Sequence, residues 1–402
     1  MWWFDRQACA VCRFDRLRWR TQRHDEVVRF VNVMLDGLHN QKIKPGEDMK
    51  SVSTLFLLRM RLTACIALSV LTSALLPNLT HAQEGVMSQS RVKGNPIAVC
   101  GHLAYVANSY SNTLSVIDLS DNHLIENLPT GEAPVNPTFN RDWTQLYVSN
   151  VKSDSLMIVD AKTGKTLKTI SSGAPRPSGL RFLPNGKHLV ISYIGAKTSD
   201  AGMLGIMDLD TGKLIKKIQV QAQSERFDIT PDGKRAYVAN IVGQTISVVD
   251  LEKGEVIKTI PSPEKLPFNV LVSPKGLRAY VANAMGNTIL ELDTTTNEVI
   301  STIKTPAGPN GMTFTPDGDN ILITSVYAGR LMSYNLSAKV VSDGAFVGLL
   351  PGFIRLAPDG LKGIFVRPYG RQVSVFDGTT LQVIQNIETG IGPSTVAICG
   401  NP

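Results

Sequence analysis

The sequence predicts an all-β protein whose main domain, residues 95–402, is a seven-bladed β-propeller of four-stranded antiparallel blades. The first observation behind this prediction is an internal repeat of 42 to 47 residues. The second is that each unit holds four short runs of β-branched and aromatic residues separated by turn residues. Units of this length with four strands are typical of propeller blades. The repeat is clearest in one aligned column: Tyr105, Tyr147, Val190, Tyr237, Tyr280, Leu322 and Phe365.

One unit shows the four expected strands in order. Its segments are 227–233, 235–240, 245–250 and 255–260, and the next unit repeats them at 270–276, 278–283, 288–293 and 298–303. Within 245–250 the side chains alternate with a period of two, as they do in a strand. Glycine or proline interrupts the chain about every ten residues, which excludes long helices.

The turns carry the residue types that tight turns need. Pro-Asp-Gly follows the first strand at 231–233, 316–318 and 358–360, and Thr-Gly-Lys lies between the third and fourth strands at 163–165 and 211–213. Proline fixes φ, aspartate bonds the nearby backbone, and glycine accepts a positive φ. The expected strands therefore fold back on one another as antiparallel neighbours.

The repeated words Tyr-Val-Ala-Asn at 105–108, 237–240 and 280–283 resemble the YVTN-family β-propeller repeat. The resemblance covers about residues 95 to 400, and the units with Val190, Leu322 and Phe365 depart from it. It implies the propeller fold and an exported or surface location. It leaves the ligand unassigned, and some similar propellers are lactonases or accompany quinone-cofactor oxidation systems.

The N-terminal part differs from the repeats. Residues 1–48 hold three of the four tryptophans, and we interpret them as a non-native upstream extension. Residues 49–82 have the pattern of a secretory signal, with Arg59 and Arg61 before an apolar run of 15 residues and Ala82 at the cleavage site. That run is shorter than the roughly 20 residues of a membrane span.

We therefore expect translation to start at Met49 or Met60 and the mature protein to be periplasmic or secreted, without a transmembrane anchor. Residues 83–94 would be a short linker before the propeller. The alternative is a genuine cytoplasmic extension ahead of a signal anchor.

Most of the basic excess also lies in the N-terminal part. The formal net charge is +7, but residues 83–402 contain 29 basic and 27 acidic residues, a net of +2. This near balance removes the electrostatic argument for nucleic acid as a partner.

The cysteines suggest how the ring is closed. Cleavage after Ala82 would remove three of the five cysteines and leave Cys100 and Cys399. These two occupy the same repeat position, in segments 97–101 and 396–400, and an exported protein folds in an oxidising compartment. We predict a disulfide between Cys100 and Cys399; the alternative is two buried thiols. Eight first-strand segments exist for seven blades, so which terminal strand closes the ring stays open.

Candidate ligand-binding residues gather where the first strands begin and in the loops between second and third strands, because both share one face around the channel mouth of a propeller. Three arginines there would suit an anionic group, since guanidinium matches carboxylate and phosphate. Asparagines at the ends of second strands are expected to bond their own turns instead. A further column of charged residues, Arg181, Asp228 and Arg355, predicts an inter-blade ion pair at least as readily as a ligand contact. The candidates are Arg176, Arg226, Arg367, Tyr369, Glu225, Asn136, Asn269 and Asn310.

We predict an exported, monomeric binding or interaction module that takes a protein, a peptide or a small anionic ligand at this Asn/Arg/Tyr-rich face. No catalytic or metal-binding motif stands out in the sequence, and no cofactor is assigned. The alternative is a lactonase-like hydrolase or an accessory protein of a quinone-cofactor oxidation system, for which Glu225 is the one acidic candidate. Binding of single-stranded nucleic acid is the least favoured reading, because few aromatic residues could stack the bases.

Overall fold

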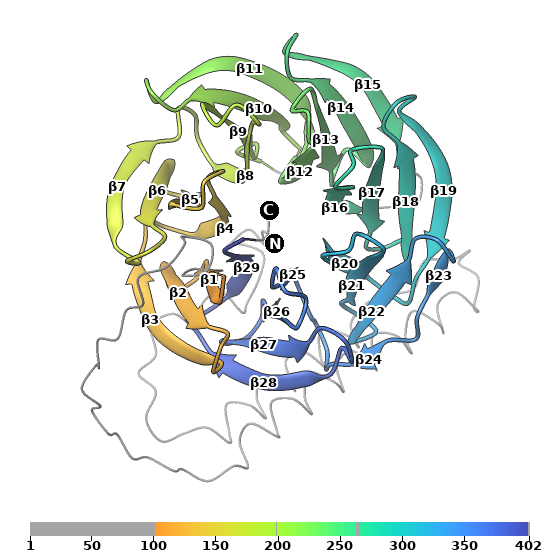
Figure 1. Cartoon of the computed structure of the whole chain (residues 1–402). Coiled ribbons are helices and arrows are strands. Elements are labelled where there is room, and N and C mark those ends of the chain that lie inside the picture. Colours follow the sequence, from red (N-terminus) through yellow and green to blue (C-terminus); the bar gives the residue numbers. More distant parts are fainter. Residues whose placement is uncertain (1–100, 198, 263–265, 401–402) are drawn as a thin grey trace, which may run out of the picture. The chain divides into compact units, whose positions relative to one another are not determined.

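The computed structural model describes residues 101–197, 199–262 and 266–400. This part is all-β and consists of seven antiparallel sheets arranged in a ring, which confirms the predicted propeller (Figure 1). The predictions about residues 1–100, including the upstream extension, the signal, the linker and Cys100, lie outside the described residues. Within the described part, the structure contains no helix long and apolar enough to cross a membrane.

We number the blades along the chain. Blade I contains β29, β1, β2 and β3; blade II contains β4–β7, blade III β8–β11, blade IV β12–β15, blade V β16–β19, blade VI β20–β24 and blade VII β25–β28. The innermost strands, which surround the channel, are β29 (Pro393–Ile398), β4 (Pro134–Phe139), β8 (Pro177–Phe182), β12 (Arg226–Ile229), β16 (Pro267–Val272), β20 (Pro309–Phe314) and β25 (Ile354–Leu356).

The second strands contain the aligned tyrosine column, and the third strands contain segments such as 245–250 and 288–293. The second strands are β1 (Leu103–Asn108), β5 (Gln145–Asn150), β9 (His188–Tyr193), β13 (Arg235–Asn240), β17 (Arg278–Asn283), β21 (Asn320–Ser325) and β26 (Lys362–Arg367). The third strands are β2 (Thr113–Asp118), β6 (Ser155–Asp160), β10 (Ala201–Asp208), β14 (Thr245–Asp250), β18 (Thr288–Asp293), β22 (Arg330–Asn335) and β27 (Gln372–Asp377).

The outer strands are largely exposed, and blade VI departs from the pattern. Its outer edge is split into β23 (Val340–Val341) and β24 (Ala345–Phe346), which both pair with β22. The other outer strands are β3 (His123–Pro129), β7 (Thr166–Ser171), β11 (Lys213–Ala222), β15 (Glu255–Pro261), β19 (Glu298–Lys304) and β28 (Val383–Glu388).

The C-terminal strand closes the ring. β29 pairs antiparallel with β1, with Ala104 opposite Ile398 and Ala107 opposite Thr395, and so supplies the innermost strand of blade I. These ladder hydrogen bonds join the C-terminal strand to the first strands of the described chain and complete blade I as a four-stranded sheet. Cys399, which follows β29, is buried and disulfide-bonded. Because Cys100 lies outside the described residues, its pairing with Cys399 stays a prediction.

The core lies between neighbouring blades. Second and third strands are buried on both faces, and side chains of adjacent blades form common apolar clusters. Tyr105 of blade I packs edge-on against Phe139 of blade II, and its hydroxyl donates to the carbonyl of Ala161 at 3.2 Å. Burial of each ring in the next blade explains why the repeat keeps a large aromatic or aliphatic residue in this column.

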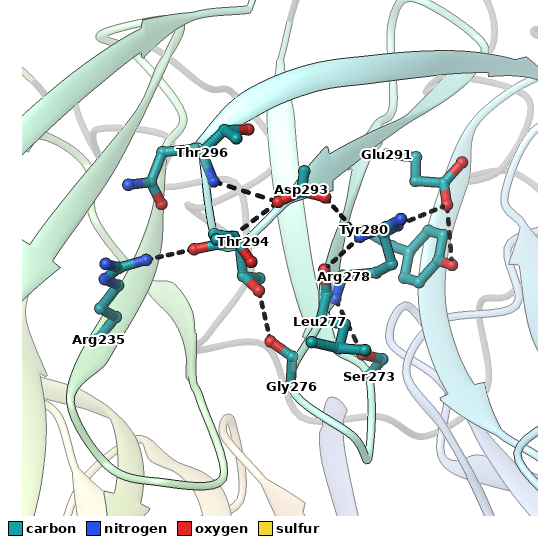
Figure 2. A network of polar contacts seen from close by, with 12 residues as sticks. Arg235, Ser273, Gly276, Leu277, Arg278, Tyr280, Glu291, Asp293, Thr294 and Thr296 are labelled. Atoms are coloured by element: carbon teal, nitrogen blue, oxygen red, sulfur yellow. Dashed lines mark hydrogen bonds and ion pairs between the residues drawn. The ribbon is translucent and has the colours of Figure 1, made fainter.

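A polar network joins blades IV and V on the outer side of these clusters (Figure 2). Arg235 of blade IV donates to the carbonyl of Thr294 in blade V. Within blade V, Arg278 Nη1 donates to Asp293 Oδ2 at 2.6 Å, and Arg278 Nε lies 3.7 Å from Glu291 Oε1. The network links turns that the sequence pattern had assigned to separate blades.

Candidate functional site

A cavity lies on the axis of the ring and is lined by residues of all seven innermost strands or their lead-in segments. The cavity has a volume of about 40 Å³, measured as the space open to the centre of a water molecule. A buried water needs about 10–15 Å³ on this measure, so the space holds about three waters or one small anionic group. Because residues two positions apart on a strand point to the same face, each inner strand can place two side chains in the cavity. The lining therefore forms two layers, one at the channel mouth and one deeper in the channel.

The layer at the channel mouth is dominated by the side chain of Arg226. Its guanidinium donates to Asn136 Oδ1 of blade II, and its Cζ lies 4.1 Å from the ring centroid of Phe353 in blade VII. Arg226 itself comes from blade IV and is only 6% exposed. The side chain therefore spans the channel mouth between three blades, held by one hydrogen bond and one cation–π contact.

Other mouth residues hold these partners in place. Asn136 donates its backbone N–H to Thr395 Oγ1 of the C-terminal strand at 2.8 Å, which ties blade II to blade I. Phe353 packs against Phe268 of blade V with ring centroids 6.1 Å apart. Asn269 Nδ2 donates to the carbonyl of Asn310 at 3.2 Å.

The deeper layer contains Arg181, which forms an ion pair, and Arg355, which is half-buried. Arg181 Nε lies 2.7 Å from Asp228 Oδ1, so the predicted inter-blade pair forms between blades III and IV. Asp228 Oδ2 also accepts the N–H of Val272 at 2.8 Å. Arg355 lines the same cavity and donates to the carbonyl of Ile354 at 3.1 Å; no ion pair joins it to a carboxylate of the described chain.

Positive charge is in excess around the cavity. Three guanidinium groups line it, and no carboxylate of the described residues does. Asp228, outside the lining, pairs with Arg181, and the buried Glu225 directly precedes Arg226 in the chain. Burial lowers the pKa of Arg226 to about 10; Glu225 opposes this shift and Arg181 adds to it. Burial likewise lowers the pKa of Arg355 to about 10, again with Arg181 contributing. Both groups stay protonated at neutral pH, so the cavity keeps at least one uncompensated positive charge.

Some of the predicted site residues meet here. Arg226, Asn136 and Asn269 line the cavity together. Asn310 borders them through its backbone carbonyl, and its own buried Oδ1 has no hydrogen-bond partner in the described chain. Glu225 acts on Arg226 through its charge.

The other predicted arginines are absent from the cavity lining. Arg176 Nη1 donates to the carbonyl of Ala196, within blade III. Arg367 bonds Ser374 Oγ at 2.8 Å and the carbonyl of Val347 at 2.6 Å. The expected group of Arg176, Arg226 and Arg367 therefore does not form, because loop arginines satisfy carbonyls of their own blade or the blade beside it. Tyr369 lies next to Arg367 in the chain and is 68% exposed.

Arg181 and Arg355 take the place of those two arginines. Each lies two residues after a residue of the mouth layer in the same blade. Residues two positions apart on a strand point to the same face. The sequence already contained this information, because Arg181, Asp228 and Arg355 align in one column of the repeat. Only the ring geometry shows that the two arginines of this column line the same cavity as Arg226.

The repeated asparagines have structural roles, as predicted. Asn240 Nδ2 donates to Thr245 Oγ1 at 3.0 Å and to Ser247 Oγ at 2.9 Å, and Asn108 makes the same pair of bonds to Thr113 and Ser115. Both asparagines are fully buried. They fasten the second strand to the third and are not available to a ligand.

Within the described residues, no cluster of three or more His, Cys, Asp or Glu side chains could hold a metal ion. The cavity lining offers guanidinium groups, amides and an aromatic ring. Guanidinium groups in a partly desolvated cavity bind carboxylate or phosphate through charge-assisted hydrogen bonds.

Comparison with known proteins supports the fold. No family model matches the chain. Over 123 residues it is 32% identical to Antigen Lp49 of Leptospira interrogans; the match covers 30% of this chain and about a quarter (26%) of that relative.

The solved structures agree on the architecture. A functionally unknown protein from Desulfotomaculum acetoxidans superposes with a TM-score of 0.65 at 17% identity, covering 75% of this chain and all of the other. Kuenenia stuttgartiensis hydrazine synthase superposes with a TM-score of 0.56 at 20% identity, covering 65% and 88%. At these identities the likeness establishes the β-propeller fold and nothing finer.

Proposed function

We propose that this protein is an exported binding module whose propeller takes an anionic group of its ligand at the channel mouth. The observation that carries the proposal is Arg226, a buried cation that spans the mouth between Asn136 and Phe353. Buried charges in proteins are normally paired. A bound anion would supply the missing negative charge.

Two further features support an anion at this place. Arg226 Nε is buried and has no hydrogen-bond partner in the described chain, so the protein leaves the guanidinium incompletely satisfied. Arg355 adds a second cation to the same cavity; it forms no ion pair with a described residue, and only the charge of the more distant Asp228 acts on it. Together they would hold a carboxylate or phosphate between two layers of the channel.

Export is part of the proposal. The signal-like segment 49–82 supports it, and so does the name of the Leptospira relative, an antigen, which is consistent with a surface or secreted protein. The propeller in turn suits a binding role, because its loops present a broad surface around one mouth.

The proposal is tested by thermal unfolding of the purified protein in acetate, citrate, phosphate and chloride at equal ionic strength. Ligand that binds only the folded state stabilises it by about 2.7 kcal/mol at 100 times Kd. We expect at least one of the first three anions to raise Tm above chloride in the wild type, and Arg226→Gln to remove that increase. The matched control is Arg141→Gln, an exposed arginine outside the cavity. Equal Tm values in all four anions would overturn the proposal.

A further inference from the structure

Exposed aromatic and aliphatic side chains border one half of the channel mouth. They lie in the loops between second and third strands of blades V, VI, VII and I, and in the connections that lead into β25 and β29. Each is between 43% and 68% exposed. We call this set the tyrosine arc: Met285, Tyr327, Leu349, Tyr369, Tyr110 and Ile391.

Backbone hydrogen bonds place the arc beside the mouth. Ser109, next to Tyr110, donates its N–H to the carbonyl of Gly392 at 2.9 Å, and its Oγ bonds Ser394 Oγ at 2.9 Å. Ser394 directly precedes the mouth residue Thr395. In blade VI, the loop that carries Tyr327 bonds the carbonyl of Gly308, just before β20 begins.

The three tyrosines are close enough to influence one another. Partial desolvation raises the pKa of Tyr369, and the phenols of Tyr327 and Tyr110 raise it further. These rings come from blades VI, VII and I, which are consecutive in the ring (Figure 1). Blade VII also supplies Phe353 to the lining of the cavity.

The charge on this half of the face is one-sided. The loop residues 109–112, 284–287, 305–308, 326–330, 347–353, 368–371 and 389–392 include Arg330 and Arg371 but no aspartate or glutamate. At the strand ends beside these loops lie Arg367, at the end of β26, and Glu388, at the end of β28. The corresponding loops of blades II and III carry the acidic residues Glu132, Asp154 and Asp200. The arc therefore favours a partner that carries both negative charge and apolar groups.

The cavity is too small for a whole organic ligand, since about 40 Å³ of accessible space admits one small anionic group. The remainder of the ligand must lie outside, and the arc is the adjoining apolar surface. We propose that the partner is the C-terminal end of an extended polypeptide, whose terminal carboxylate binds Arg226 and whose preceding apolar side chains pack on the tyrosine arc. This inference rests on the function proposed above.

The observations favour a peptide over other anionic ligands. A polynucleotide carries one charge per nucleotide and needs a basic track, whereas the arc loops offer only scattered arginines. The tail of a fatty acid favours an enclosed apolar site, while the arc side chains stand open to water. Tyrosine rings supply both apolar area and a hydroxyl for peptide groups, which is why they are enriched in protein recognition surfaces.

The test uses a pool of fluorescein-labelled hexapeptides with randomised residues and free C-terminal carboxylates, and the same pool made as C-terminal amides. We expect the full-length mature protein to retain peptides of the free-acid pool that are rich in apolar residues. Resynthesised as an amide, a retained peptide should bind about tenfold more weakly or worse, the loss expected for a charge-assisted contact. Arg226→Gln should weaken the acid form and leave the amide unchanged.

The arc is tested separately with the double variant Tyr110→Ser, Tyr369→Ser. We expect it to lose at least tenfold in affinity for the retained peptide while its stabilisation by phosphate or acetate stays that of the wild type. The matched control is Leu361→Ser, an exposed leucine at the Pro-Asp-Gly turn on the opposite face. The control should bind the peptide normally.

The two proposals fail in different ways. If small anions stabilise the wild type through Arg226 but no free-acid peptide is retained, or acid and amide bind equally, the peptide inference is wrong and the anion site stands. Retention of oleate or of oligothymidylate in place of peptides would also overturn the inference. If neither small anions nor peptides bind, both proposals fall.

Discussion

Arg181 Nε lies 2.7 Å from Asp228 Oδ1, so one of the three arginines that line the cavity is paired with a carboxylate of the neighbouring blade. We expect Asp228→Asn to lower the free energy of unfolding by about 2–3 kcal/mol, because it leaves buried cations without their counter-charge. Urea unfolding measures the loss. Glu298→Gln, which removes the exposed pair with Lys258, is the control and should cost less than about 1 kcal/mol. Equal effects of the two variants would contradict the role given to Asp228.

A second prediction concerns Glu291 of blade V, which is buried. Its Oε1 accepts from Tyr280 at 3.3 Å and lies 3.7 Å from Arg278 Nε, while Oε2 has no partner in the described chain (Figure 2). The equivalent residues of β2 and β14 are Val116 and Val248. We expect Glu291→Val to leave stability unchanged or raise it, since valine removes a poorly compensated buried charge.

The same network provides the control for that prediction. Arg278→Leu should destabilise the wild type by about 1–2 kcal/mol, because Glu291 then loses its cation. In the Glu291→Val background the cost should be smaller, although the 2.6 Å bond from Arg278 to Asp293 is still lost. A double-mutant cycle by urea unfolding measures the coupling. Zero coupling would show that Arg278 does not compensate Glu291.

Acid should destabilise the propeller through the aspartates that end the third strands. Hydrogen bonds from Thr211 lower the pKa of Asp208, and those from Thr380 lower the pKa of Asp377. A carboxylate whose folded pKa is depressed contributes stability that is present above its unfolded pKa and lost as pH falls through the folded one. We therefore expect Tm to fall as pH drops below about 3.8, the unperturbed value.

The matched experiment for this prediction is Asp208→Asn combined with Asp377→Asn. Both substitutions remove the titrating groups, so Tm of the variant should depend less on pH between about 5 and 2 than Tm of the wild type. Asp359→Asn, in a turn on the same face, is the comparison substitution. Parallel Tm curves for wild type and double variant would contradict the assignment.

Cys399 is disulfide-bonded, and we predict Cys100 as its partner. Peptide mapping of the exported protein without reductant should recover one peptide pair that joins these cysteines. A bridge across about 300 residues would stabilise by about 5 kcal/mol in the chain-entropy model. Reduction or Cys100→Ser should therefore lower Tm markedly. Recovery of both cysteines as free thiols would overturn the pairing.

The start of the mature chain is also predicted. N-terminal sequencing of the exported protein should begin at Gln83, because Thr80 and Ala82 suit signal cleavage. A mature protein that retains residues 13–23 would show that the upstream segment is a genuine part of the protein.

The sequence alone determined the blades. The period near 43 residues, the alternation in segments such as 245–250 and the Pro-Asp-Gly turns are local signals, and the structure places strands where they predicted. The ion pair between Arg181 and Asp228 was foreseen as one reading of an aligned column, because equal positions in neighbouring repeats become neighbours in the ring. The roles of Asn108 and Asn240 followed from their short-range turn chemistry.

Tertiary structure decided the rest. Only the pairing of β29 with β1 showed that the C-terminal segment closes the ring, since two equivalent segments competed for one place in the sequence. Only the ring showed that Arg226 crosses to Phe353, and that Arg367 turns to Val347 and Ser374 instead. The physical reason is the same in each case: a repeat fixes which backbone position a residue occupies, whereas the direction of a long side chain depends on acceptors and rings supplied by blades far away in the chain.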